Sequence, residues 1–246
     1  MTIDFRALTS AHDLAPLPAF EKFIWGGESE MVSVNVLVAT IEEGGMAMAA
    51  YDRDVLVGVV YGFATREPAV LHSHYLAVHP DYRGGGLGEQ LKRRQAAWCT
   101  SNGYSAMRWT FDPLQLTNAH LNLNKLGAFG VHYRIDLYGS LGGINGSLPS
   151  DRLVVQWEFV RGRPPIGETV ALEVPPVTPQ DIASSAPEAV AARMAVREVM
   201  VSHLDDGWQA PPPRQVRWLS RGLEEGVCPP ESGREDAGVR GDLTCP

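Results

Sequence analysis

The apolar and polar residues of the first 160 positions change their spacing several times along the chain. Alternation at every second position predicts half-buried strands. These strands are expected at residues 3–8, 47–52, 55–64, 69–78, 105–111, 129–139 and 152–160. Apolar residues that recur every three or four positions predict helices at residues 10–26, 30–45, 86–101 and 116–128. Gly44 and Gly127 end the second and the last of these helices.

This order of elements predicts the fold class. We expect an α/β (α+β) fold with one mixed, mostly antiparallel, twisted sheet flanked by helices. One strand–helix–strand crossover, from residue 69 to residue 111, should place two strands side by side in parallel.

The composition changes near residue 160. Every Phe and Tyr lies at or before Phe159, whereas 12 of the 18 prolines lie in the last 84 residues. We therefore predict a domain at residues 1–162 and an extension at residues 163–246 that cofactor binding does not need. Because proline fixes φ and removes a hydrogen-bond donor, residues 161–180 read as an extended, Pro-rich linker. One helix at about 180–205 and a largely irregular tail should follow.

Charge and cysteine usage exclude several classes of function. The net charge is 21 − 29 = −8, which argues against nucleic acid or an anionic membrane surface as a partner. No apolar run approaches the roughly 20 residues of a membrane span, and the N-terminus lacks the pattern of a signal peptide. A cytoplasmic location is therefore expected. Cys99, Cys228 and Cys245 form no CxxC pair or metal-ligand spacing, so no metal site is predicted.

The stretch "HSHYLAVHPDYRGGGLGEQLKRR", residues 72–94, joins a predicted strand to a predicted helix through four glycines. Glycines at such a turn let the backbone approach a ligand, and the free N–H groups of a helix's first turn suit a pyrophosphate. The spacing is neither GxxxxGK[ST] nor GxGxxG after a first strand. It is R-x-x-G-x-G, from Arg83 to Gly88. A flexible loop is the alternative interpretation of a bare glycine run.

The stretch "LAVHPDYRGGGLGEQL" resembles the acyl-CoA signature of the Gcn5-related N-acetyltransferase (GNAT) superfamily. The predicted element order from residue 3 to about 160 is similar as well. The stretches "WTFDPLQLTNAHLNLNKLGA" and "LPSDRLVVQWEF" resemble a branch known only as predicted acetyltransferases. The resemblance implies a GNAT-like domain at residues 1–162. It also implies acetyl-CoA, or another acyl-CoA such as succinyl-CoA, as cosubstrate.

The resemblance also implies which residues hold the cosubstrate. Backbone amides of the glycine turn would bind the pyrophosphate, which points to Arg83, Gly84, Gly85, Gly86, Leu87, Gly88 and Glu89. The main chain of the preceding strand would pair with pantetheine, which points to Leu76, Ala77 and Val78. An N–H of Ala77 or Val78 would then face the thioester oxygen. Asn118 would contact the pantetheine arm, and Lys92, Arg93 and Arg94 either reach the 3′-phosphate or form a solvated basic face.

Two histidines on the strand before the turn are candidates for the general base. An amine attacks a thioester only when neutral, and histidine has the pKa for accepting its proton. By the period of two, His72 and His74 should share one face with Leu76 and Val78. "HSHYLAVH" is similar to the HxHxLAVH pattern of the arylalkylamine N-acetyltransferases, in which both histidines are implicated in proton removal. The alternative is a core histidine that is hydrogen-bonded to a neighbouring strand.

The general acid for the thiolate is less defined. Many relatives place a tyrosine where this chain has Leu123. Tyr133 and Tyr138, predicted on the following strand, are substitutes, although both also fit as packing aromatics and water could serve instead. Cys99 lies about three helical turns, roughly 16 Å, beyond the glycine turn, which favours direct attack over an acyl-enzyme.

The function implied by these residues is that of an acyl-CoA-dependent N-acyltransferase. The acceptor would be the primary amine of a small molecule or an amino acid, in a ternary complex. One alternative is a non-catalytic acyl-CoA sensor, and another is transfer to a protein N-terminus or lysine. The chain is compatible with a homodimer.

Overall fold

The computed structural model describes residues 2–26, 31–159, 169–203 and 215–219. A seven-stranded sheet with the order β1-β2-β3-β4-β5-β7-β6 forms its centre. Within this seven-stranded sheet only the β4–β5 pair is parallel, so the predicted mixed, mostly antiparallel sheet is confirmed. The strands are β1 (Ile3–Leu8), β2 (Met46–Asp52), β3 (Val55–Ala64), β4 (Val70–Val78), β5 (Ala106–Phe111), β6 (Phe129–Arg134) and β7 (Arg152–Glu158).

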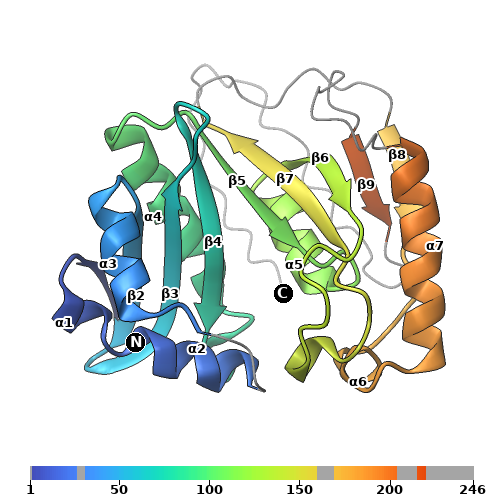
Figure 1. Ribbon diagram of the computed structural model, residues 1–246, viewed down its shortest axis with the longest axis horizontal. Coiled ribbons are helices and arrows are strands. Elements are labelled where there is room, and N and C mark those ends of the chain that lie inside the picture. The colour runs from blue at the N-terminus through green and yellow to red at the C-terminus, as the bar shows by residue number, and fades with distance from the viewer. Residues whose placement is uncertain (1, 27–30, 160–168, 204–214, 220–246) are drawn as a thin grey trace, which may run out of the picture.

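Helices cover both faces of this sheet (Figure 1). The helices α1 (Ala11–Leu14), α2 (Leu17–Trp25) and α3 (Val34–Glu42) bury one apolar cluster against β2 and β3. The long helix α4 (Leu87–Ser101) packs on the opposite face of the same strands. Among the helices of the described residues, none is long and apolar enough to cross a membrane.

Two predicted helices have different boundaries because local chemistry interrupts them. The helix expected at residues 10–26 is divided into α1 and α2, since Pro16 lacks an N–H and stands at the start of the second. The helix expected at residues 116–128 is one α-helical turn, α5 (Leu116–Ala119), followed by a wider π-helix at His120–Lys125. The N–H of Leu126 accordingly donates to the carbonyl of Leu121, five residues earlier, at 2.9 Å.

The sheet opens between β4 and β5. Their parallel pairing covers Val70 to His72 on β4 and Ala106 to Arg108 on β5, and the pair His72–Arg108 is the last. Beyond it the two strands diverge toward the lower edge of the view in Figure 1. The edge of β4 from Ser73 to Val78 therefore has no strand partner on this side within the residues described.

The C-terminal extension contains β8 (Thr169–Glu173), α6 (Pro179–Ser184), α7 (Pro187–His203) and β9 (Gln215–Leu219). Two helices replace the single helix predicted at about 180–205, because Ser185 adopts a φ of 54° and Pro187 starts the second helix. The strands β8 and β9 pair in parallel, so part of the predicted linker and part of the predicted irregular tail form a small sheet. Residues 220–246 of that tail lie outside the described residues.

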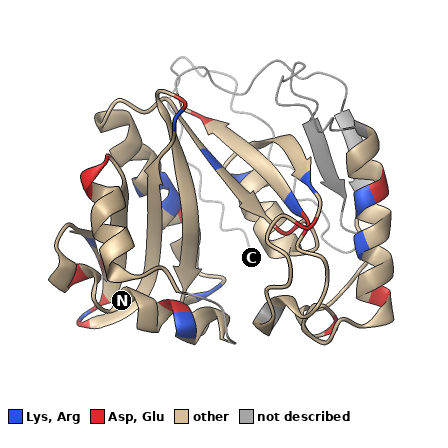
Figure 2. Ribbon diagram, viewed as in Figure 1, with Lys and Arg blue, Asp and Glu red and all other residues tan. Residues whose placement is uncertain are grey.

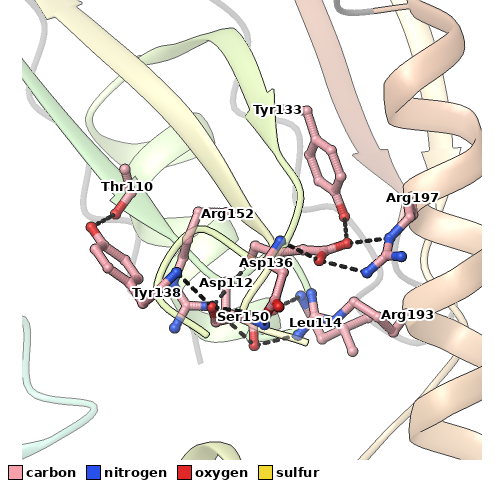
Figure 3. Close-up of polar contacts among 11 residues, drawn as sticks. Thr110, Asp112, Leu114, Tyr133, Asp136, Tyr138, Ser150, Arg152, Arg193 and Arg197 are labelled. Carbon is pink, nitrogen blue, oxygen red and sulfur yellow. Dashed lines mark hydrogen bonds and ion pairs between the residues drawn. The ribbon is translucent and has the colours of Figure 1, made fainter. Parts of the chain in front are cut away.

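Packing crosses the boundary that composition predicts at residue 162. On α7, Ala189, Ala192, Val196 and Met200 are buried in the same apolar cluster as residues of β5, β6 and β7. The guanidinium of Arg193 donates to the Asp112 carboxylate at 2.7 Å, and both side chains are buried. Figure 3 shows Arg193 and Arg197 reaching from α7 toward the strands. The helix α7 therefore shares a core with the first 162 residues.

Candidate functional site

A β-bulge at His74 shapes the strand that leads to the glycine turn. Tyr61 of β3 pairs with Tyr75, and the next residue, Gly62, pairs with Ser73. His74 is the extra residue and has no partner in this register. Because side chains alternate along a strand, one extra residue reverses the face that every later side chain occupies.

The bulge overturns one prediction about this strand. Leu76 and Val78 do not share a face with the histidines, because they pack against α4 on one side of the sheet. Ala77 packs on the other side, in the cluster with α1, α2 and α3. The rings of His72 and His74 also lie on this other side, where their centroids are 5.8 Å apart. The predicted pair of histidines is thus held together, but on the opposite face from the α4 helix.

Aromatic rings surround the two histidines and lower the pKa values of both. The His72 ring lies 4.9 Å from Phe63, and His74 contacts Tyr61, Phe63 and Tyr75. Burial lowers the pKa of His72 to about 4, and the neighbouring His74, Lys92 and Arg108 reinforce this shift. Burial alone lowers the pKa of His74, whose side chain remains partly open to solvent. Of the two, His74 is therefore the more accessible and the less perturbed base.

The depressed pKa of His72 predicts acid sensitivity. A group whose pKa is lower in the folded state contributes stability above its unfolded pKa and loses that contribution as the pH falls toward its folded value. The free energy of unfolding should therefore fall between about pH 6.5 and pH 4, and less steeply in a His72→Gln variant. Urea denaturation at several pH values measures this, with His12→Gln as control because the His12 side chain is fully exposed. Identical pH profiles for wild type and His72→Gln would contradict the prediction.

The glycine turn forms a cradle at the start of α4. Gly84 and Gly86 have φ values of 78° and 79°. Apart from adjacent residues, no atom of the described residues lies within 4 Å of where a Cβ would stand at either position. Gly86 is the N-cap of α4, and no side chain caps this end of the helix. The N–H groups from Gly86 to Glu89 precede the first intrahelical bond, which Gln90 donates. Open space and unpaired amides at a helix N-terminus fit a pyrophosphate.

The other residues predicted at this turn surround the cradle. The Arg83 Nε atom donates to the carbonyl of Val78 at 3.1 Å, which ties the turn to the end of β4. Leu87 is buried and anchors α4, and Gly88 lies close to Leu76. Glu89 forms an ion pair with Arg93 at 2.8 Å, which lowers the pKa of its carboxyl group. The remaining predicted contact, Asn118, is exposed on α5.

A branched side chain at Gly86 should impair cosubstrate binding. In Gly86→Val, the added atoms would occupy the open cradle, and a β-branched residue tolerates a φ of 79° poorly. We expect at least tenfold weaker acetyl-CoA binding by calorimetry, about 1.4 kcal/mol. Gly103→Val is the matched control, because Gly103 also has a positive φ (84°) and open space but follows the other end of α4. Equal acetyl-CoA affinities in the two folded variants would show that the cradle is not part of the binding site.

The tyrosines proposed as acid are placed unfavourably for proton donation. Tyr133 is buried on β6, and its hydroxyl donates to Asp151 at 2.8 Å. Burial and this bond raise the pKa of Tyr133 well above its ordinary value. Tyr138 does not lie on the strand, because β6 ends at Arg134, and its hydroxyl lies 3.1 Å from that of Thr110. Leu123, where relatives carry tyrosine, is buried in the core.

The basic residues after the turn do not form one solvated face. Figure 2 shows basic residues of α4 behind β3 and β4. Arg93 is exposed beside Glu89, and the guanidinium of Arg94 lies 3.9 Å above the Phe5 ring. Lys92 instead is buried beneath β4, where its Nζ atom donates to Ser73 Oγ at 2.8 Å. The sequence contained no signal for this burial, because Lys92 is the first residue of the basic run Lys92-Arg93-Arg94.

The loop between β6 and β7 crosses to the other half of the sheet. A Cβ at Gly143 in this loop would lie 2.9 Å from the carbonyl oxygen of Trp25, at the end of α2. The ring of Trp25 in turn packs on Tyr75, one residue past the bulge. The loop and α2 therefore border the histidine face from opposite halves of the sheet. In the described parts of the chain, no three His, Cys, Asp or Glu side chains gather as a metal site.

The glycine cradle beside an opened parallel strand pair agrees with a family comparison. Residues 14–127 match the model of the acetyltransferase (GNAT) family. The chain carries a GNAT acetyltransferase domain. It is therefore placed among the transferases, as the glycine motif predicted. The assignment to one branch of that superfamily stays a prediction. No curated protein sequence matches the chain.

Solved GNAT structures share the fold at low sequence identity. The acetyltransferase yncA of Salmonella typhimurium, solved with its cofactor acetyl-CoA, has a TM-score of 0.53 and 15% identity over 67% of this chain and 98% of its own. A GNAT acetyltransferase of Elizabethkingia anophelis with acetyl-CoA bound gives 0.51 and 14% over 64% and 98%. The ribosomal-protein-S18-alanine N-acetyltransferase of Escherichia coli gives 0.51 and 14% over 64% and 94%. These similarities establish the GNAT fold.

Proposed function

We propose that this protein transfers an acyl group from acyl-CoA to the primary amine of a small molecule or an amino acid. The observation that carries the proposal is the cradle of Gly84 and Gly86 at the start of α4. It comes directly after a bulged strand whose edge has no strand partner among the described residues. An anion-binding helix terminus continuous with a free strand edge suits a molecule with a pyrophosphate at one end and amide groups along its length.

The residues of the chain divide the chemistry among them. The amides from Gly86 to Glu89 bind the pyrophosphate, and the edge of β4 from Leu76 to Val78 pairs with pantetheine. An N–H of the free β4 edge between Ser73 and Val78 stabilises the negative charge that develops on the thioester oxygen. His74 accepts the proton of the attacking amine, since its lowered pKa keeps the ring neutral at pH 7. Acetyl-CoA is the expected donor, with succinyl-CoA as the alternative.

Direct attack in a ternary complex is favoured by the state of the cysteine. Cys99 is fully buried, and burial raises the pKa of its thiol to about 12. A thiol with such a pKa is protonated at neutral pH and is a weak nucleophile. The acceptor amine therefore attacks the thioester without an acyl-enzyme.

The surroundings of His74 suggest the kind of acceptor. Its neighbours are Tyr61, Phe63, His72 and Tyr75, so an amine attached to an apolar or aromatic body would bury surface beside the base. A small molecule or an amino acid with such an amine suits these apolar surroundings better than a charged, lysine-rich peptide. A cytoplasmic location and a homodimer belong to the same proposal.

Two measurements test the proposed function. Mass spectrometry of ligand retained through purification should identify coenzyme A or an acyl derivative. Steady-state assays with acetyl-CoA, succinyl-CoA and a panel of amines, read with a thiol-trapping dye, should then show release of free thiol. Acyl-CoA binding without thiol release across the panel would favour the sensor function instead. Turnover only with peptide amines would favour a protein acetyltransferase.

A further inference from the structure

A buried lysine lies where the sheet opens. Lys92 is only 3% exposed, and its Nζ atom lies 2.8 Å from Ser73 Oγ and 3.8 Å from the centroid of the Trp109 ring. No carboxylate forms an ion pair with it in the part of the chain that the structure describes. Lysines are almost never fully buried unless a partner compensates the charge. The missing counter-ion is therefore unusual.

The position of this amine relates it to the strand edge. Ser73 and Trp109 are the first residues of β4 and β5 beyond the last parallel pair, His72–Arg108. Lys92 thus closes the point at which the two strands separate, on the side that faces α4. Val78, at the glycine turn, lies five residues from Ser73, about 16 Å along the strand. A cosubstrate whose pyrophosphate lies at that turn and whose arm follows β4 points its thioester toward Lys92.

The pKa of Lys92 allows it to give up and take up a proton near neutral pH. Burial lowers the pKa of Lys92 to about 7, and the nearby Cys99 on the same helix opposes this shift slightly. On β4, His72 lies across the sheet from Lys92, and the charge of Lys92 helps to lower the pKa of His72. The hydrogen-bond partner of Lys92 is the uncharged Ser73 hydroxyl, which itself donates to Gln95 Oε1 at 2.6 Å. The Ser73 hydroxyl is thereby oriented to accept from Lys92.

We propose that Lys92 donates a proton to the coenzyme A sulfur when the acyl group is transferred. This inference rests on the proposed function. As the amine nitrogen bonds to the carbonyl carbon, the carbon–sulfur bond breaks and sulfur leaves with the electron pair. The Lys92 ammonium gives its proton to that sulfur, which produces the free thiol and a neutral lysine. The proton lost by the amine passes to the base and then to solvent, and Lys92 regains a proton from solvent. Lys92 would thus serve as the general acid, the role that relatives are expected to give to a tyrosine at the position of the buried Leu123.

The thiol of bound coenzyme A reports on this contact directly. Its ultraviolet thiolate absorption is titrated with the full chain and free coenzyme A. With wild type, we expect a thiol pKa at least one unit below that of free coenzyme A, a tenfold larger thiolate-to-thiol ratio at the same pH. Lys92→Met should abolish this shift, whereas Lys22→Met, which removes an exposed lysine from α2, should retain it. Equal thiol pKa values in wild type and Lys92→Met would overturn the inference. Absence of coenzyme A binding would overturn the proposed function itself.

Stability and rate separate this role from a structural one. Methionine has a similar length and no charge, so Lys92→Met should leave the Tm unchanged or raise it. Its kcat should fall tenfold or more, with less than a threefold change in KM for acetyl-CoA. A lower Tm with normal kcat per folded molecule would identify a structural lysine.

The chain has only three lysines, Lys22, Lys92 and Lys125, so an NMR titration can resolve them. A Lys92 pKa near 10.5 would also contradict the proposal.

Discussion

Replacement of His74 by alanine should lower kcat roughly 10²- to 10⁴-fold, the range expected for a lost general base. The bulge leaves His74 without a partner in the β3–β4 register, and its side chain is exposed on the face opposite α4. Its lowered pKa keeps the ring neutral and ready to accept a proton at pH 7. Acetyl-CoA affinity should change little, because the amides of the glycine turn carry it. Steady-state kinetics and calorimetry measure the two effects.

Two further variants distinguish a base from a structural histidine. His74→Gln retains hydrogen bonding but cannot take up the proton, so its rate should resemble that of the alanine variant. A structural histidine would tolerate glutamine and lose stability with alanine. His12→Ala, on the surface of α1, controls for the loss of a histidine. Normal rates in His72→Ala, His74→Ala and the double variant, below the pKa of the acceptor, would exclude histidine as the base.

The second large effect is expected from Asp112→Asn. The carboxylate of Asp112 accepts from Arg193 at 2.7 Å, lies 3.9 Å from Arg152, and all three side chains are buried. Asparagine keeps the size but removes the charge, which leaves two buried guanidinium groups without this counter-ion. Loss of one partner of a buried ion pair costs about 3–5 kcal/mol. The free energy of unfolding in urea should fall by this amount.

Matched variants test whether burial of the charge is the cause. Asp112→Asn combined with Arg193→Met removes both partners of the closest pair and should recover part of the lost stability. Arg6→Met breaks an exposed ion pair with Asp4 and should change the stability little. A loss below about 1 kcal/mol in Asp112→Asn would show that the Asp112–Arg193 pair contributes little to the stability of the fold. A chain ending at residue 162 would lack Arg193, Val196 and Met200, so we expect it to be less stable than the full chain.

Features of the fold that depend on neighbouring residues can be predicted from the sequence. The spacing of apolar positions predicted the order of strands and helices, since each period reflects the geometry of one element. The run from Arg83 to Gly88 predicted the cradle, because only glycine adopts the positive φ values of Gly84 and Gly86 without strain. Proline interrupts helices for an equally local reason, and Pro187 accordingly begins a new helix within a segment whose apolar pattern alone predicts one helix.

The tertiary structure alone decided which side chains meet. The strand period placed Leu76 beside His74, but a single extra residue opposite Tyr61 reversed the later faces, and such a bulge depends on the pairing with β3. Lys92 belongs to a basic run that indicates solvent, yet α4 packs with this residue over the opening between β4 and β5. Arg193 finds Asp112 across 81 positions of sequence, a contact created by the docking of α7. Long-range packing sets the charge and burial of these side chains. The spacing of residues along the sequence therefore does not predict them.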